Sequence, residues 1–183
     1  MKMCQFNFLL TNEPSEDFLV KSIASEIGLN YSKRELNIIG FHAINAFLTT
    51  RTSCDCGSVL GKNYRENSSE PDWQKEKKKL ERKKFSNKRT ELLLEQRRNE
   101  FAERNSEAVE KELRESRKWI EFIHDPRLKK QLSKIGILYH QFSGRLEDEK
   151  IKIGVESQIS SNKVNVEFLR NIQEDEIVWV QLK

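Results

Sequence analysis

The chain has 183 residues, of which 36% are hydrophobic and 34% are charged, and its formal net charge is only +4. This length fits one domain with an appendage, and so mild a charge does not by itself indicate nucleic-acid binding. No stretch approaches the roughly 20 apolar residues of a membrane span, and the N-terminus lacks the apolar core of a signal peptide. With three cysteines, an odd number that favours reduced thiols over a disulfide framework, these features predict a cytoplasmic protein without a membrane partner.

Residues 1–60 have the pattern of a β-α-β unit. Apolar and polar side chains alternate between Cys4 and Leu10, which predicts a strand with one buried face. Apolar residues then recur at helical spacing up to position 27, and Gly28 suits the position just after a helix end. The apolar run 38–49 is rich in β-branched and aromatic residues, so it predicts a second strand that is covered on both faces.

The middle of the chain predicts a long, charged helical hairpin. A polar linker, 61–72, precedes the arm 73–143, whose first part is rich in Lys, Glu, Arg, Gln and Leu and lacks Gly and Pro. A turn at residues 104–107 would divide the arm into two antiparallel helices, 73–104 and 107–143. At about 1.5 Å per residue, such helices would reach on the order of 50 Å from the rest of the fold.

The two arms of this hairpin differ in their apolar seams. From Val109 to Phe142 the returning arm carries apolar residues at heptad spacing, although Pro126 must kink or break it near Asp125. The seam of the outgoing arm is incomplete. An incomplete apolar stripe favours completion by another helix, from a protein partner or from a second copy of the chain.

Residues 144–183 predict a second half of the sheet. Apolar residues alternate with charged ones over 151–155, and 177–182 forms another apolar strand. Between them, 164–172 is either a short helix capped by Asn165 or a further strand. The whole pattern predicts an α+β protein: a small antiparallel sheet of the ferredoxin-like βαβ-βαβ type, with the helical hairpin inserted between strands two and three.

The outgoing arm carries a concentrated basic segment. Residues 75–98 hold eleven basic residues and four glutamates, whereas 99–122 hold seven glutamates and five basic residues. One interpretation is a solvated helix whose charges face the acidic returning arm; the others are contact with nucleic-acid phosphates or with an acidic protein surface. The candidate nucleic-acid-binding residues are Lys77, Lys78, Lys79, Arg82, Lys83, Lys84, Lys88 and Arg89.

A second candidate site is the pair Cys54 and Cys56, one residue apart. Two thiols can hold a soft metal ion such as zinc or exchange with a disulfide, but a tetrahedral zinc site needs further ligands. In a split βαβ fold we expect His140 to be within reach, whereas Cys4 would lie at the opposite end of the sheet and His124 too far along the helix. The alternative is two cysteines without a ligand, and no cofactor.

No pattern in the chain indicates catalysis. No Ser or Cys stands at a spacing that would make a nucleophile with a histidine base, and the seven glycines form no phosphate-binding loop. We therefore expect a non-catalytic binding or assembly protein that engages a protein partner or itself through 73–143. The alternatives are nucleic-acid binding through Lys75–Arg98 and a thiol- or metal-dependent protein centred on Cys54 and Cys56.

Overall fold

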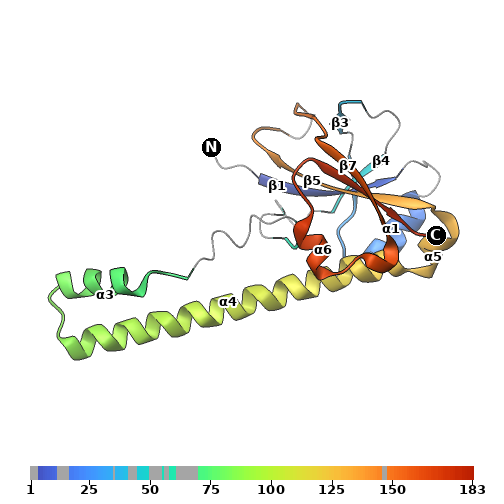
Figure 1. Ribbon diagram of the computed structural model, residues 1–183. Helices are drawn as coiled ribbons and strands as arrows, with labels where there is room; N and C mark the ends of the chain where they lie inside the picture. Colours follow the sequence, from blue (N-terminus) through green and yellow to red (C-terminus); the bar gives the residue numbers. More distant parts are fainter. Residues whose placement is uncertain are drawn as a thin grey trace. The chain divides into compact units, whose positions relative to one another are not determined.

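The computed structural model of the chain describes residues 4–11, 17–34, 36–40, 45–49, 55, 58–60, 70–145 and 148–183. The chain forms two compact units: a sheet unit made of Met1–Tyr64 and Leu113–Lys183, and a helical unit made of Arg65–Glu112. The strands are β1 (Cys4–Thr11), β2 (Ser32–Arg34), β3 (Asn37–Ile38), β4 (Asn45–Leu48), β5 (Lys134–Phe142), β6 (Lys150–Ile151), β7 (Val155–Ser160) and β8 (Glu176–Gln181). The helices are α1 (Asp17–Glu26), α3 (Trp73–Arg82), α4 (Asn87–His124), α5 (Pro126–Gln131) and α6 (Val166–Asn171), with a 3-10 turn at Ser161–Lys163 (Figure 1).

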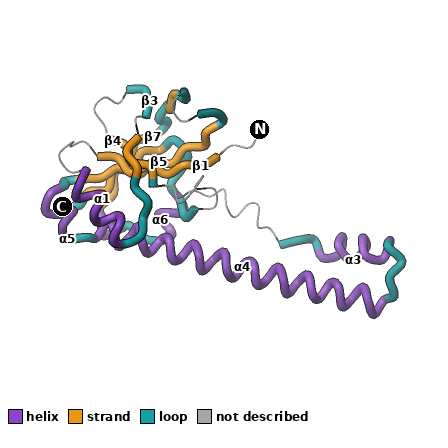
Figure 2. The backbone as a smooth tube through the Cα atoms, turned by 180° about the vertical axis from the view of Figure 1, so that it is seen from behind, coloured by secondary structure: helices purple, strands orange, loops and turns teal. Residues whose placement is uncertain are grey.

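The sheet unit is built on a six-stranded sheet in the order β2-β4-β1-β5-β8-β7. Every neighbouring pair is antiparallel except β7 and β8, which run parallel. Strands β3 and β6 form a separate two-stranded parallel sheet. Figure 2 shows the six-stranded sheet from behind, with helices gathered on one side of it. The class is therefore α+β, as the sequence predicts.

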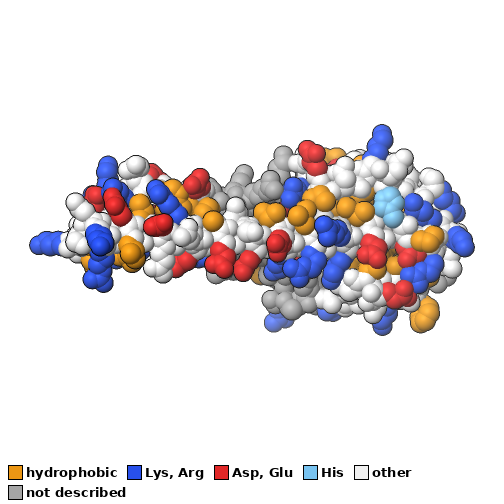
Figure 3. Space-filling view, turned by 90° about the horizontal axis from the view of Figure 1, so that it is seen from below, with side chains coloured by type: hydrophobic (Ala, Val, Ile, Leu, Met, Phe, Trp, Pro, Cys, Tyr) orange, Lys and Arg blue, Asp and Glu red, His pale blue; other side chains and the backbone are white. Residues whose placement is uncertain are grey.

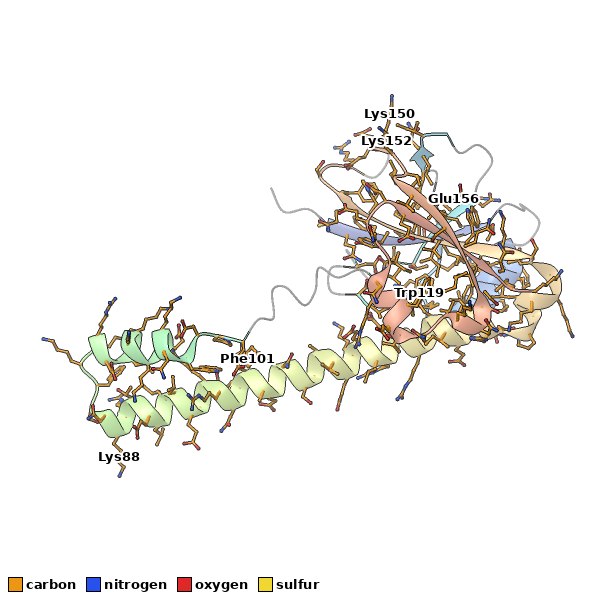
Figure 4. All side chains as sticks on the ribbon, in the orientation of Figure 1. Lys88, Phe101, Trp119, Lys150, Lys152 and Glu156 are labelled. Atoms are coloured by element: carbon orange, nitrogen blue, oxygen red, sulfur yellow. The ribbon has the colours of Figure 1, made fainter. Side chains whose placement is uncertain are left out.

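Two apolar layers hold the sheet unit together, because the central strands are covered on both faces. One row of cross-strand neighbours (Phe47, Leu9, Ile137, Val178) faces the helices. Helices α1, α4, α5 and α6 cover this row with the buried side chains Val20, Ile23, Trp119, Phe122, Ile123, Leu128 and Leu169. Figure 4 shows Trp119 on α4 beneath the sheet, where its buried side chain anchors the helix to the sheet unit.

The opposite face of the sheet packs against the small β3–β6 sheet. Here Leu10, Gly136 and Trp179 are cross-strand neighbours on β1, β5 and β8. Ile38 and Ile151, which pair in the small sheet, belong to the same apolar cluster. Along each central strand, every second side chain thus points into one apolar layer, and the side chains between them point into the other.

Several local predictions are confirmed. The first strand forms as β1, and α1 ends at Glu26 with Gly28 in the left-handed region at a φ of 71°. Of the two alternatives left open for 164–172, the helix is seen: residues 166–171 form α6, capped by the Asn165 side chain, which accepts a hydrogen bond from the Phe168 N–H at 2.8 Å. The predicted strand 38–49 is seen in part as β3 and β4, and residues 41–44 lie outside the described ranges. The predicted strand over 151–155 is replaced by β6 and β7.

The prediction of helix over residues 134–142 is wrong, because this segment is strand β5 at the centre of the sheet. Nearly all of its side chains are buried. A strand covered on both faces is apolar at almost every position, and it therefore also satisfies the heptad spacing of a helix. Since β5 lies between β1 and β8, and β1 pairs antiparallel with β4, the ferredoxin-like order is not confirmed.

The helical unit turns at a different place from the predicted one. Helix α4 runs without interruption through 104–107, so the expected turn there is wrong and a hairpin with equal arms is not confirmed. The chain turns instead between α3 and α4, where Lys84 adopts a φ of 58° and its N–H donates to the Glu81 carbonyl at 2.9 Å. The predicted break at Pro126 is confirmed: α4 ends at His124, and the Asp125 side chain caps α5.

None of the helices in the described ranges has both the length and the apolar character needed to cross a bilayer.

Candidate functional site

Helix α3 packs against the first part of α4. Leu80 of α3 is buried together with Thr90 and Leu94 of α4. At the other end of this contact, the rings of Trp73 and Phe101 meet edge to face, with their centroids 5.9 Å apart. Figure 4 shows Phe101 on the side of α4 that faces α3. These contacts fix which side chains the pair of helices exposes.

The outer surface of these two helices is strongly basic. Glu76 is the acidic partner within the pair: it accepts from Lys79 and from Arg97, each at 2.6 Å, and the hydrogen bond from Lys79 is the main cause that lowers its pKa. Lys75 pairs with Asp72, the N-cap of α3, at 3.4 Å. The other eight cations of 75–98 form no ion pair with any residue that the structure describes. They are Lys77, Lys78, Arg82, Lys83, Lys84, Lys88, Arg89 and Arg98. Figure 3 shows Lys and Arg side chains gathered at the end of the helical unit that holds the turn.

The position of the turn explains why this charge is left without acidic partners. A turn at 104–107 would have laid the basic arm along the acidic stretch that follows it. With the turn between Arg82 and Asn87, α3 instead lies along the first part of α4, which is basic as well. The expectation that the basic residues face an acidic returning arm is therefore wrong.

A groove between α3 and α4 interrupts this surface. Its volume is about 380 Å³, and Trp73, Lys77, Leu94 and Arg98 are among its lining residues. The Arg98 guanidinium lies 5.6 Å from the centre of the Trp73 ring. At the turn, the Arg89 guanidinium lies 4.8 Å from the centre of the Phe85 ring in the same way. Glu91 and Glu95 also line the groove, so it combines an aromatic ring with side chains of both charges.

The predicted metal ligands Cys54 and Cys56 lie outside the described residues. Asp55, between them, is described: its N–H donates to the Gln5 carbonyl at 2.7 Å, and its carboxylate accepts from the Asn7 N–H at 2.7 Å. Residue 55 therefore sits beside the start of β1. The expected distance of Cys4 from Cys56 concerns a residue outside the described ranges, but the parallel pair of strands on which it depended is wrong, because β1 and β4 are antiparallel neighbours.

His140, the third predicted metal ligand, is in the middle of β5 and not at the end of a helix. The residue is 8% exposed, and its ring lies between two carboxylates. Its Nδ1 contacts Asp175, and its Nε2 lies 3.5 Å from Oε1 of Glu149 without forming a hydrogen bond. Oxygen atoms of Glu174 and Asp175 and a ring nitrogen of His140 all lie within 4.8 Å of one another.

Sequence reasoning missed these acidic neighbours of His140. Glu174 and Asp175 stand in the turn between α6 and β8, more than thirty residues from His140 in the chain. They meet it only because β5 and β8 pair in the sheet. The one available signal was the acidic run 174–176 directly before an apolar strand. His124, by contrast, ends α4, with its Nδ1 3.5 Å from Lys129 Nζ.

Comparisons of the chain with models of protein families, with curated proteins and with solved structures find no match.

Proposed function

We propose that the chain is a binding protein that recognises nucleic acid through the basic surface of its helical unit. This basic surface is defined as the eight cations of 75–98 that form no ion pair with a described residue. The observation that carries the proposal is their concentration: 75–98 hold more net positive charge than the whole chain, which carries +4. Because like charges held together repel one another, such a surface is stabilised by a partner that supplies many negative charges.

The distribution of the cations favours a nucleic acid over a short acidic peptide. The eight side chains come from α3, from the turn and from α4, so they surround the end of the helical unit and do not form one stripe. A phosphate backbone can contact such a surface at several points at once. The groove beside Trp73 adds an aromatic ring on which an unpaired base can stack, although Glu91 and Glu95 line it together with Lys77 and Arg98.

Fluorescence anisotropy with labelled single-stranded and duplex RNA and DNA tests this proposal. Affinity should fall steeply with salt, with a slope of log K against log salt of about −0.9 per phosphate contacted on a duplex. The variant Lys78→Glu, Lys83→Glu, Lys84→Glu, Lys88→Glu changes four exposed side chains; Figure 4 shows Lys88 pointing away from α3. Loss of four contacts should reduce the magnitude of the slope by about 3 to 4 and the affinity at about 0.1 M salt by about three orders of magnitude.

A matched control reverses the same number of charges on the sheet unit. Lys21, Lys150, Lys152 and Lys163 are exposed, and Figure 4 shows Lys150 and Lys152 at the edge of the sheet unit. Their change to Glu alters the net charge equally but leaves the basic surface intact, so most of the affinity should remain. The proposal fails if no nucleic acid binds at low salt, or if both variants lose affinity to the same extent.

A second candidate function is self-association through the helical unit, as the incomplete apolar seam predicts. One feature of the structure favours it: α4 continues from the basic surface into a stretch, 100–112, with five glutamates and two basic residues. The basic surface of one copy complements this stretch of another, and Leu92 and Val109 are exposed apolar side chains on the same helix. Light scattering should then show a dimer at low salt that dissociates at high salt; a monomer at every salt concentration contradicts it.

A further inference from the structure

We propose that His140, Glu174 and Asp175 form a binding site for one divalent transition-metal ion, with Glu149 holding the histidine ring in place. The proposal is independent of nucleic-acid binding, because all four residues belong to the sheet unit. It retains His140 from the metal set predicted by the sequence but replaces the cysteines with carboxylates. One imidazole nitrogen and two carboxylate oxygens are ligands that suit Zn²⁺ or Mn²⁺, whereas soft ions prefer thiolates.

The backbone of β5 fixes the two carboxylates on either side of His140. The Asp175 N–H donates to the Tyr139 carbonyl at 3.2 Å, and Oε1 of Glu174 accepts from the Gln141 N–H at 3.1 Å. The turn that carries both acids is therefore tied to the residues that flank His140. Asp175 itself has a φ of 59°, a left-handed conformation that Asp and Asn adopt more readily than most other residues. The ligands are thus positioned by hydrogen bonds that do not involve a metal ion.

The spacing of the three ligand atoms suits a single ion. They lie within 4.8 Å of one another, and two ligands of an ion with bonds of about 2.1 Å stand at most about 4.2 Å apart. A small rotation of Glu174, whose side chain is exposed, closes this difference. Three protein ligands leave coordination positions for water, as in zinc sites that are not purely structural.

The hydrogen bonds of His140 provide a second, independent argument for a cation. Nε2 is buried and has no hydrogen-bond partner, although Glu149 Oε1 lies 3.5 Å away. A neutral imidazole carries one proton. If the proton is on Nδ1, it is donated to Asp175, and the Nε2 lone pair then faces the Glu149 carboxylate. If the proton is on Nε2, the Nδ1 lone pair faces the Asp175 carboxylate instead.

A metal ion bound at Nδ1 removes this conflict. His140 Nδ1 and Asp175 are in direct hydrogen-bond contact, so the Asp175 side chain has to rotate away from the ring for an ion to replace the proton between them. The proton then moves to Nε2, where it points at Glu149. Histidine ligands of metals usually donate their second N–H to a carboxylate in this manner. Glu149 is held ready for that role, since it accepts from the Ser143 N–H at 3.1 Å and from the Ser143 hydroxyl at 3.4 Å.

The electrostatic environment of the site also favours a cation. The carboxylates of Glu149, Glu174 and Asp175 stand close to the His140 ring, and Glu176 follows Asp175 in the chain. Among the residues that the structure describes, no Lys or Arg forms an ion pair with Glu149, Glu174 or Asp175. Within the described part of the chain, the negative charge at this turn therefore has no basic partner.

Calorimetric titration of the full chain, after treatment with a chelator, with Zn²⁺ and with Mn²⁺ tests the site. We expect one ion to bind per chain, with a Kd below about 10 µM. Asp175→Asn keeps a residue that tolerates the left-handed backbone, and Glu174→Gln changes an exposed side chain, so both variants should fold. Each should weaken binding by at least about tenfold. In NMR spectra, the metal should shift the ring signals of one histidine, and these signals should be missing in His140→Gln.

Two controls separate this site from the other metal-binding residues of the chain. A variant with all three cysteines changed to Ser should bind as tightly as the wild type, and so should His124→Gln. The proposal is overturned if neither ion binds at about 100 µM. It is also overturned if the cysteine variant loses binding while Asp175→Asn keeps it, or if every variant binds like the wild type.

Discussion

The sheet makes a sharp prediction at Gly136, which has large neighbours on both adjacent strands. In Gly136→Ala the added Cβ would lie 2.9 Å from Cβ of Leu10 and 3.0 Å from the Trp179 ring. Carbon atoms in contact normally stand about 3.5 to 4.0 Å apart, so the new methyl group overlaps both neighbours. Neither can move away easily: the Trp179 ring donates to Glu156 and lies under Lys134, and the Leu10 Cβ is attached to the central strand β1.

The overlap should destabilise the fold by about 1 to 3 kcal/mol, the usual cost of an extra methyl group in a packed core. Loss of glycine's freedom in the unfolded chain works against this by about 0.4 to 1 kcal/mol. We therefore expect the free energy of unfolding to fall by about 1 to 2 kcal/mol, measured from urea unfolding followed by tryptophan fluorescence, with an unchanged slope against urea.

Gly154→Ala is the matched control, because a Cβ there has no atom within 4 Å. Gly154 does not have a positive φ either, since the described glycines with positive φ are Gly28 and Gly40. Its free energy of unfolding should stay within about 0.5 kcal/mol of the wild type. If Gly136→Ala is as stable as Gly154→Ala, then β5 does not lie between Leu10 and Trp179, and the strand order derived from that register is refuted.

Two further predictions concern α4 and the start of α5. Ser106→Pro should break α4 and lower the helical signal in circular dichroism, because proline in a helix interior costs about 3 kcal/mol; an unchanged spectrum would favour a turn at 104–107. Arg127 donates to Asp125 and to Glu26 and lowers the pKa of both carboxyl groups. The two ionised carboxylates therefore stabilise the fold at pH values above their ordinary pKa, and this contribution is lost as the pH falls and they become protonated. In urea unfolding, the difference in stability between wild type and Arg127→Gln should therefore shrink from neutral pH towards about pH 3; a constant difference would contradict this.

Elements with a local signal could be predicted from the sequence. Gly28 marks the end of α1, Asn165 caps α6 and Pro126 ends α4, because each of these residues acts on the backbone of its immediate neighbours. Strand β5 has no such signal. Its burial on both faces brings apolar residues to both sides of the strand, and the helical sequence before it gave these residues an apparent helical phase.

The candidate metal site could be predicted only in part, for a related reason. His140 was recognisable as a possible ligand from its residue type, but its partners Glu174 and Asp175 come from the next strand connection in the sheet. No spacing rule joins residues so far apart in the chain. The strand order had to be known first, and that order was mispredicted where β5 was taken for helix.

The position of one turn decides how the basic segment is interpreted. Had the turn formed at 104–107, the eleven cations of 75–98 would have faced glutamates, and weak surface ion pairs would have accounted for them. Because α3 ends at Arg82 and the chain turns directly afterwards, two basic segments lie side by side instead. The left-handed Lys84 carries no sequence signal for such a turn, since glycine or asparagine usually occupies that position. We therefore propose nucleic-acid binding because α3 ends at Arg82 and leaves most of these cations exposed. The Ser106→Pro test bears on this proposed function as directly as it bears on the fold.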